Sequence, residues 1–266
     1  MTASVAVQLE FAGLSDVGRS RSRNEDSFEI SREAGLALVC DGMGGHAGGD
    51  IASRTVAEVV VQSILRDGKS GQEPDALIRA AVHQANHRLV SLNQQRGFPE
   101  GRGMGTTLVG LWLLAETNRV LVFHAGDSRL YRLRAGEFRQ LTRDHSLYQA
   151  WLDAGGHGQA PHRNIIIRAL GTSSDTVPDT KTETVNPGDL FLICSDGLSG
   201  MLSDPEISEV LGKGGDLPAL CKRLVDLANE KGGHDNVTVV LARATNAQAR
   251  ATDTPARATT ARARAS

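Results

Sequence analysis

Short apolar segments that end at an aspartate are the feature of this chain that most constrains its fold. Mostly apolar runs over 36–40, 119–125 and 190–194 are followed within two residues by Asp41, Asp127 and Asp196. A fourth aspartate, Asp235, comes just before the apolar run 237–241. Runs of this length bounded by turn residues predict buried strands. One aspartate at a strand end is commonly a turn former, but four of them, three beside a glycine, indicate a shared site.

Three longer segments, 50–65, 74–95 and 217–230, show the 3.6-residue apolar spacing of a helix. The order along the chain is then strands, two helices, several strands that include a hairpin over 130–141, a helix and a last strand. A doubly wound parallel sheet would alternate more regularly. This order therefore favours an α+β fold with antiparallel sheets and helices packed outside.

Charge is unevenly distributed along the chain. The 266 residues hold 29 Lys and Arg against 31 Asp and Glu, a net charge of −2 that argues against binding nucleic acid through bulk charge. From residue 245 onward Leu, Ile, Val and Phe are missing, and removing 243–266, with its five arginines and one aspartate, would leave −6. Such a segment cannot bury enough apolar surface to fold. We expect a folded body over 1–244 and a disordered basic tail over 245–266, either solvated or touching an acidic partner.

We expect neither a membrane-spanning segment nor a secretion signal in this sequence. The longest uncharged stretch, 103–115, has 13 residues and is too short to cross a bilayer. The first 14 residues lack a basic start and contain Glu10. Cys40, Cys194 and Cys221 form no C-x-x-C pair, so we expect neither a disulfide framework nor a thiolate zinc site. We expect a cytoplasmic protein without stable membrane insertion.

The four aspartates predict a metal site. Carboxylates brought together repel strongly unless a positive charge lies between them, and no matching cluster of Lys or Arg stands beside them in the sequence. An all-oxygen donor set favours Mg²⁺ or Mn²⁺, and the neighbouring glycines let backbone carbonyls join it. His83 and His87, four apart on a predicted helix, could share zinc. No third ligand is apparent for them, so two polar surface residues are the simpler interpretation.

A rival interpretation concerns 42–47, whose two glycines and alanine match the G-x-G-x-x-A pattern of dinucleotide-binding loops. Asp41 would then place a negative charge beside the pyrophosphate. The acidic residue expected about 20 positions later should end a second strand, but Glu58 and Asp67 fall in a predicted helix or at its end. A nicotinamide-dependent oxidoreductase is therefore the weaker hypothesis.

Seven short segments, in order over about residues 9–242, carry a family resemblance. They are Ser15-Asp16-Val17-Gly18 with Arg21-x-x-Asn24-Glu25-Asp26, Asp41-Gly42-Met43-Gly44-Gly45-His46, Gly103-Met104-Gly105-Thr106-Thr107, Gly126-Asp127-Ser128-Arg129, Arg168-Ala169-Leu170-Gly171, Ser195-Asp196-Gly197-Leu198 and Asp235-Asn236-Val237-Thr238. In this order they resemble the metal-dependent protein serine/threonine phosphatases of the PP2C type (the PPM family) in their bacterial form. The resemblance implies an α/β/β/α sandwich of two antiparallel β-sheets flanked by pairs of helices.

The resemblance also implies a set of metal ligands. Asp41 resembles the carboxylate that bridges two cations, and the carbonyl of Gly42 resembles a ligand of the second cation. Asp196 and Asp235 resemble the remaining carboxylates of the first cation. Asp127, with Asp196, resembles the ligand pair of a weaker third cation in bacterial members. The implied cofactors are two Mn²⁺ or Mg²⁺ ions per chain, with this third site in addition.

Arg21 resembles the family's phosphate-binding arginine, and a guanidinium fork matches two phosphate oxygens better than an ammonium does. Arg19 and Arg23 would face the same way on an extended segment, and only the spacing to the Asn24-Glu25-Asp26 motif singles out Arg21. We interpret Arg19 and Arg23 as solvated surface residues.

Glu25 and Asp26 resemble groups that hold metal-bound waters. Asn236 resembles a support for the loop that carries the last aspartate. Thr106 and Thr107 are interpreted most simply as strand packing.

The implied reaction is the hydrolysis of phosphoserine and phosphothreonine monoesters by in-line attack of a metal-bridging hydroxide, without a phospho-enzyme. Met43 stands where eukaryotic relatives have a histidine proposed as the general acid, and a thioether cannot donate that proton. His46 and a metal-bound water both stay open for this role. Segment 144–180 resembles the family's variable flap beside the active site.

The partners implied by the resemblance are phosphorylated proteins, namely bacterial Ser/Thr kinases and their substrates. We expect a monomer. The alternative hypothesis is a catalytically silent phosphoprotein-binding module of the same fold. Loss of the metal aspartates would favour that alternative, but all of them are present.

Overall fold

Two antiparallel sheets packed face to face form the centre of the protein in a computed structural model, which describes residues 6–44, 48–99, 101–114 and 117–247. The first sheet has the order β1-β11-β10-β7-β8, and the second has the order β2-β3-β5-β6-β9, with β4 paired to β3. The first sheet consists of β1 (Val7–Asp16), β7 (Arg129–Arg134), β8 (Glu137–Gln140), β10 (Leu190–Cys194) and β11 (Val237–Asn246). The second consists of β2 (Asp26–Ser31), β3 (Leu36–Met43), β4 (Gly105–Thr106), β5 (Leu108–Leu114), β6 (Arg119–Ala125) and β9 (Asp179–Thr184).

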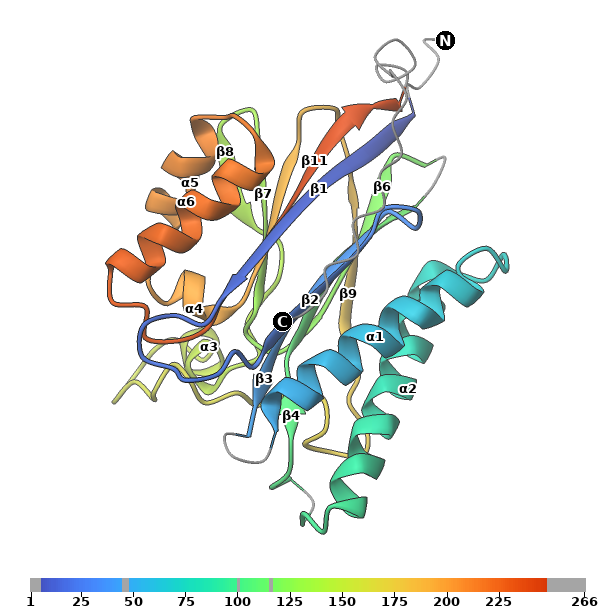
Figure 1. The fold of residues 1–266 in the computed structure, drawn as a ribbon, viewed down its shortest axis with the longest axis vertical. Helices are drawn as coiled ribbons and strands as arrows, with labels where there is room; N and C mark the ends of the chain where they lie inside the picture. The colour runs from blue at the N-terminus through green and yellow to red at the C-terminus, as the bar shows by residue number, and fades with distance from the viewer. Residues whose placement is uncertain (1–5, 45–47, 100, 115–116, 248–266) are drawn as a thin grey trace, which may run out of the picture.

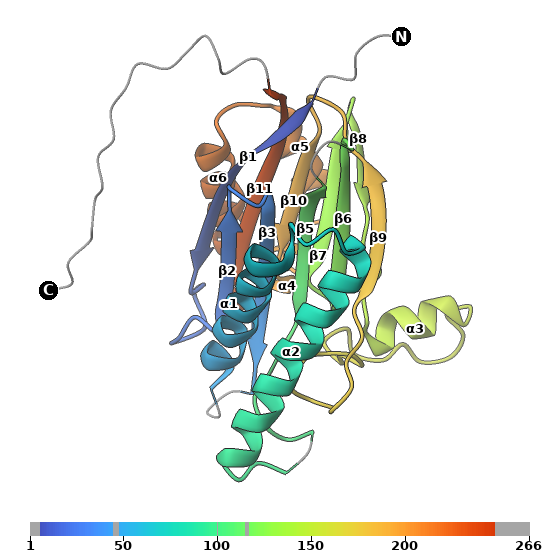
Figure 2. The same cartoon turned by 90° about the vertical axis from the view of Figure 1, so that its right-hand side faces the viewer.

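Helices cover the outer face of each sheet. Helices α1 (Gly49–Asp67) and α2 (Pro74–Gln95) lie across the second sheet, as Figure 2 shows. Helices α4 (Asp196–Ser199), α5 (Asp204–Gly212) and α6 (Leu217–Glu230) cover the first sheet on the opposite side of the molecule (Figure 1). The short α3 (Leu147–Asp153) stands away from the sandwich and has no buried residue. Among the described helices, none has the length and apolar character needed to cross a bilayer.

Alternation along the strands divides the interior into three apolar cores. On β3, Leu36, Leu38 and Cys40 face α1 and α2, whereas Ala37 and Val39 face the other sheet. All five side chains are buried, because this strand is covered on both faces. This explains why β3 reads as a continuous apolar run although its sheet is antiparallel. The predicted α+β sandwich with flanking helices is confirmed.

Several elements differ from the sequence-based expectation. The three predicted helices are present, but α5 and the outer strands β1, β2 and β9 were not foreseen, because their polar residues obscure the apolar pattern. Asp41 lies within β3, two residues before its end, and not beyond it. Strand β11 runs to Asn246, two residues past the expected end of the body. Residues 248–266 of the predicted tail lie outside the described residues.

Strand direction brings the four aspartates to one end of the sandwich. Strands β3, β6 and β10 finish at this end, and β7 and β11 begin there, since Cys194 at the end of β10 pairs with both Arg129 and Val239. In Figure 1 this is the lower end, where α4 lies. Within the second sheet, Asp26 at the start of β2 is directly opposite Asp41. The register thus adds a fifth carboxylate to the same end.

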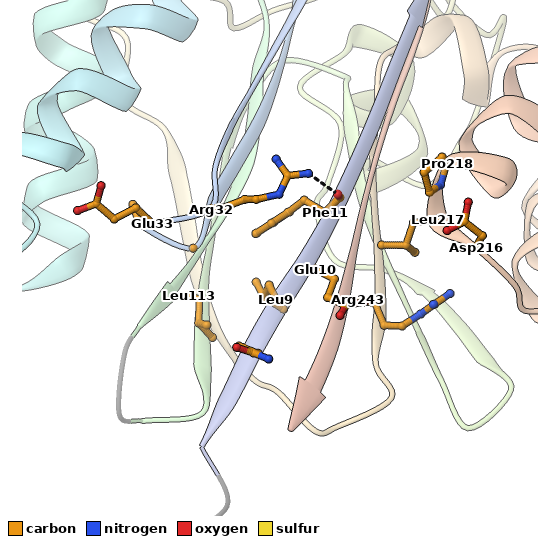
Figure 3. A pocket seen from close by; sticks show the side chains of 13 residues that line it. Leu9, Glu10, Phe11, Arg32, Glu33, Leu113, Asp216, Leu217, Pro218 and Arg243 are labelled. Atoms are coloured by element: carbon orange, nitrogen blue, oxygen red, sulfur yellow. Dashed lines mark hydrogen bonds between the residues drawn. The ribbon is translucent and has the colours of Figure 1, made fainter. Parts of the chain in front are cut away.

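A pocket of about 450 Å³ lies at the opposite end of the molecule. Figure 3 shows it between β1, the β2–β3 turn and the start of α6, with Arg32 donating a hydrogen bond of 3.0 Å to the carbonyl of Phe11. Its β1 residues pair with the far end of β11, where Gln8 is opposite Thr245. None of the clustered aspartates lines this pocket.

The core between the two sheets should carry much of the stability. Phe191 on β10 is fully buried there. We expect Phe191→Ala to lower the free energy of unfolding by about 3–5 kcal/mol, through lost apolar burial and the cavity left behind. Urea denaturation measures this change. Leu152→Ala, at an exposed position of α3, is the control and should change it by less than about 0.5 kcal/mol. Equal losses in the two variants would contradict the packing described.

Candidate active site

Five carboxyl groups meet at the lower end of the sandwich. Asp41 interacts electrostatically with the other four, which are Asp26, Asp127, Asp196 and Asp235. The side chains of Asp41 and Asp196 also share a hydrogen bond. The sequence-predicted aspartates therefore converge, although they come from both sheets and from four separate parts of the chain.

The cluster resists ionisation. Burial raises the pKa of Asp41 well above its usual range, and the neighbouring carboxylates raise it further. Burial, and then the charge of Asp196, raises the pKa of Asp127 to about 7. Burial likewise raises the pKa of Asp26 to about 7, against hydrogen bonds that lower it. A cation between the carboxylates would lower these pKa values again, because an opposite charge favours the ionised form of a carboxyl group.

Unpartnered oxygens show that the donor set fits a hard divalent cation. Oδ1 of Asp26 and Oδ1 of Asp127 are buried and have no hydrogen-bond partner. Such groups are costly unless something pairs with them. All the ligands available in the cluster are oxygens, which suits Mn²⁺ or Mg²⁺. The residues that would hold such ions are those that the family resemblance implies, Asp41, Gly42, Asp127, Asp196 and Asp235.

Gly42 lies where the backbone is tightly packed around the cluster. A Cβ atom at this position would be 2.2 Å from the carbonyl oxygen of Gly49 and 2.5 Å from that of Glu25. The Gly42 N–H donates to the same Glu25 carbonyl at 3.1 Å. Only glycine lets the strand carrying Asp41 approach the start of α1 this closely.

Two threonines fix the backbone of Asp41. The Asp41 N–H donates to Oγ1 of Thr107 at 3.0 Å, and the Asp41 carbonyl accepts from the Thr107 N–H at 2.9 Å. The same carbonyl accepts from Oγ1 of Thr106 at 2.9 Å. The interpretation of these threonines as strand packing was therefore incomplete: they are buried, and they also hold the central carboxylate in place.

Asn236 connects the loop after β1 to the start of β11. Its side-chain amide donates to the carbonyls of Val17 and Arg23 at 2.9 and 2.8 Å. Its Oδ1 accepts from the Glu25 N–H at 2.8 Å, and its own N–H donates to Asp235 at 2.8 Å. Asn236 thus fixes the segment that carries Arg21, a wider role than the predicted support of one loop.

Arg21 reaches the edge of the cluster. Its guanidinium donates to Oδ2 of Asp235 at 2.7 Å, with the two side chains 52% and 37% exposed. Arg19 and Arg23 are also exposed. Among the three arginines, Arg21 is the one with an ion pair to a cluster aspartate in the described structure. It lies beside the carboxylates and remains open to solvent.

A sequence profile of the protein phosphatase 2C family matches residues 18–242, nearly all of the described chain. This protein belongs to that family. A serine/threonine phosphatase, PstP of Mycobacterium tuberculosis, is 39% identical over 249 residues, which are 90% of this chain and 46% of the relative. The chain therefore spans about half the length of this mycobacterial protein. The serine/threonine phosphatase stp of Listeria monocytogenes is 34% identical over 236 residues, which are 85% of this chain and 92% of that protein.

Solved structures of the PP2C family share the fold. A crystal structure of the PstP catalytic domain in complex with two manganese ions superimposes with a TM-score of 0.79 at 36% identity, covering 90% of this chain and 99% of that one. PppA of Pseudomonas aeruginosa gives a TM-score of 0.79 at 35% identity, with 91% and 100% covered. The predicted family is therefore confirmed, and the dinucleotide-binding interpretation of 42–47 is wrong.

Asp26 is supported by a residue that the sequence analysis of this PP2C chain passed over. Ser195 is fully buried and donates from Oγ to Oδ2 of Asp26 at 2.7 Å, while the same Oγ accepts from the Thr238 N–H at 3.0 Å. Glu25 lies over the start of α1, where its carboxylate approaches Gly49. Burial, and then the charge of Asp50, raises the pKa of Glu25. Asp26 thus belongs to the cluster and Glu25 borders it; their role in ordering metal-bound water stays a prediction.

The remaining candidate residues that the structure describes lie in different parts of this PP2C protein. Met43 ends β3 next to the cluster, and His46 lies outside the described residues. His83 and His87 are exposed on α2, which fits their interpretation as surface residues. A separate group of two histidines and an aspartate, His124, His145 and Asp179, offers ligand atoms within 4.8 Å of one another. The sequence analysis did not find this group because its members are far apart in the chain.

The raised pKa values of Asp26 and Asp127 predict how stability depends on pH without metal. The folded protein holds protons between about pH 4 and 7 that the unfolded chain has lost, so its unfolding free energy falls as pH rises through this window. In EDTA, we expect the raised carboxyl pKa values to favour the folded state at pH 5 over pH 8 by at least about 1 kcal/mol, partly offset by His124 and His145, whose pKa is lowered by burial and whose contribution has the opposite sign. Mn²⁺ should stabilise it more at pH 8, because the ligands must be ionised.

Urea denaturation at the two pH values, with and without Mn²⁺, measures both effects. Asp127→Asn is the matched variant and should reduce the pH dependence, since it removes one of the two titrating groups. An unchanged pH dependence in Asp127→Asn would show that the carboxyl group of Asp127 is not held protonated in the metal-free protein.

Proposed function

We propose that this protein hydrolyses phosphoserine and phosphothreonine monoesters in other proteins, using two Mn²⁺ or Mg²⁺ ions and a third that binds more weakly. The observation that carries the proposal is the convergence of Asp41 with four other carboxylates beside an exposed arginine. The named activity of the relatives, serine/threonine phosphatase, agrees with it. The partners we propose are phosphorylated proteins, such as bacterial Ser/Thr kinases and their substrates, acted on by a monomer.

Each aspartate would bind the cations that the family resemblance assigns to it. Asp41 would bridge two ions, Asp196 and Asp235 would complete the first, and the Gly42 carbonyl would join the second. Asp127, with Asp196, would hold the third. Bound cations lower the pKa of the attacking water and offset charge on the phosphoryl group during in-line displacement.

Arg21 would orient the substrate. Its guanidinium can form two parallel hydrogen bonds to phosphate oxygens, and its loop is held by Asn236. No side chain needs to act as a nucleophile: Ser195 is fully buried with its hydroxyl donating to Asp26, and the three cysteines are buried. This supports direct attack by water without a phospho-enzyme.

Metal removal tests the proposal most directly. We expect hydrolysis of a phosphothreonine peptide to stop in excess EDTA and to return on addition of Mn²⁺, because the carboxylate cluster cannot activate water by itself. Phosphate release measures the rate. Activity that persists after complete removal of metal would disprove the mechanism. Binding of the peptide without turnover, with Mn²⁺ present, would instead favour a silent phosphoprotein-binding module.

Single substitutions test the residue roles. Asp196→Asn should reduce kcat by at least about 100-fold, because it weakens a carboxylate shared between cations. Arg21→Ala should raise KM for the phosphopeptide about 10- to 100-fold, the equivalent of one lost charge-assisted contact. Arg23→Ala is the matched control, two residues away and exposed, and should change neither constant by more than about twofold. A larger loss in Arg23→Ala than in Arg21→Ala would disprove the assignment.

A further inference from the structure

Two stacked histidines lie beside the carboxylate cluster and have no part in the proposed reaction. The rings of His124 on β6 and His145 are 4.5 Å apart between centroids and inclined by only 9°. Both residues are buried, and burial lowers the pKa of each, that of His145 to about 4. The two rings are therefore neutral at pH 7, and each has one nitrogen that donates and one that accepts.

Their hydrogen bonds argue against a zinc site. Nδ1 of His145 accepts from the Gly126 N–H at 3.1 Å, so the proton of this neutral ring is on Nε2, which faces Oδ2 of Asp179 at 3.3 Å. Neither nitrogen of His145 then has a lone pair for a metal. Within the group this leaves His124 and Asp179, too few for the usual three or four protein ligands of zinc.

The same hydrogen bonds clamp the residue that precedes Asp127. The Gly126 N–H donates to Nδ1 of the His145 ring. The Gly126 carbonyl accepts from the backbone N–H of His145 at 2.9 Å. Gly126 has φ +122°, and a Cβ atom there would be 2.6 Å from the side chain of Thr107. His145 thus fixes both polar backbone groups of a residue in a conformation that only glycine adopts easily.

Asp127 depends on this backbone for its position. It is buried, its Oδ1 has no hydrogen-bond partner, and the interactions that lower its pKa are a backbone hydrogen bond and the charge of Arg129. No described side chain is recorded as a hydrogen-bond partner of its carboxylate. The direction of the carboxylate is therefore set by the 126–128 turn.

The other edge of the His145 ring is anchored in the predicted flap region. Asp179 faces Nε2 and is itself paired with Arg168, and in the sheet it is opposite His124. The His145 carbonyl accepts from the Ile167 N–H at 2.9 Å. The ring is therefore stacked on one face, and Nε2 faces Asp179 at 3.3 Å outside hydrogen-bond geometry, while Nδ1 points to Gly126.

We propose that His145 is a positioning residue for Asp127: it holds the Gly126 backbone so that the Asp127 carboxylate is ready to bind the third divalent cation. This inference rests on the proposed function for the identity of that cation. It assigns no proton transfer and no metal bond to His145. Partners that orient a ligand in this way typically change metal affinity by 10- to 100-fold when they are removed.

Calorimetric titration of the metal-free full chain with Mn²⁺ is the test. Asp127→Asn should remove or weaken the weakest class of binding. His145→Ala should weaken the same class at least about tenfold and change tighter binding by less than about twofold. His145→Asn should stay within about threefold of the wild type, because the amide oxygen can accept from the Gly126 N–H at the place of Nδ1. His83→Ala, an exposed histidine on α2, is the matched control and should change nothing.

Two further readouts separate positioning from a general loss of structure. In the double variant with Asp127→Asn, His145→Ala should weaken Mn²⁺ binding no further, since both act on one ligand. Nitrogen NMR of the His145 ring should show the Nε2-protonated tautomer with and without Mg²⁺, which is diamagnetic and leaves the ring signals observable. If His145→Ala does not fold, His145→Gln replaces it: its amide reaches towards Asp179 and leaves Gly126 without an acceptor, so the same loss is expected.

The outcomes are distinct. The inference is overturned if Asp127→Asn or His145→Ala leaves Mn²⁺ binding unchanged. It is also overturned if His145→Asn binds Mn²⁺ as weakly as His145→Ala does, or if the effects of Asp127→Asn and His145→Ala on Mn²⁺ affinity are additive in the double variant. A metal-induced change to the ring nitrogens themselves would also overturn it. If the wild type hydrolyses no phosphopeptide but Asp127→Asn and His145→Ala weaken Mn²⁺ binding alike, the proposed function fails and the positioning role stands.

Discussion

The repulsion among five carboxylates at one end of the sandwich is the constraint on which the rest of the structure depends. Asp41 is at the centre, and every neighbour raises the energy of its ionised form. A chain can keep such a cluster only if the surrounding fold is rigid enough to prevent the carboxylates from turning out to water. Packing and hydrogen bonds elsewhere in the molecule must offset the free energy that it costs to hold these carboxylates together.

The sandwich supplies that rigidity by burying its strands on both faces. Five consecutive residues of β3, up to Cys40, are fully buried immediately before Asp41. Where the strands end, hydrogen bonds hold the backbone and side chains in place of apolar packing. Thr107 holds the backbone of Asp41, Ser195 holds Asp26, and Asn236 holds the loop of Arg21. Neutral hydrogen-bonding groups of this kind hold the backbone and the Asp26 carboxylate without adding charge to a site that must remain attractive to cations.

The sequence was sufficient for the features that depend on local pattern. Apolar runs ending near Asp41 and Asp196 predicted both the strands and the convergence of their carboxylates. The supporting contacts could not be predicted in the same way, because they join residues far apart in the chain. Thr107 is 66 positions from Asp41, and Ser195 is 169 positions from Asp26. A threonine in a strand and a serine before a helix each have an ordinary local explanation, and only the tertiary register gives them a second role.

The ion pair between Arg21 and Asp235 joins the two residues to which the proposed function assigns the substrate phosphate and a cation. The pair is exposed, and ion pairs of this kind contribute only about 0–1 kcal/mol. A phosphate dianion offers the same guanidinium two charge-assisted bonds, each worth about 1.5–3 kcal/mol. In the proposed function, the arginine would exchange one exposed carboxylate contact for a contact with two phosphate oxygens. Transfer of Arg21 to phosphate would then free the Asp235 carboxylate for a cation, and a cation at Asp235 would free the arginine for phosphate. Each ligand thus removes a competitor of the other, so metal and substrate should bind with mutual preference.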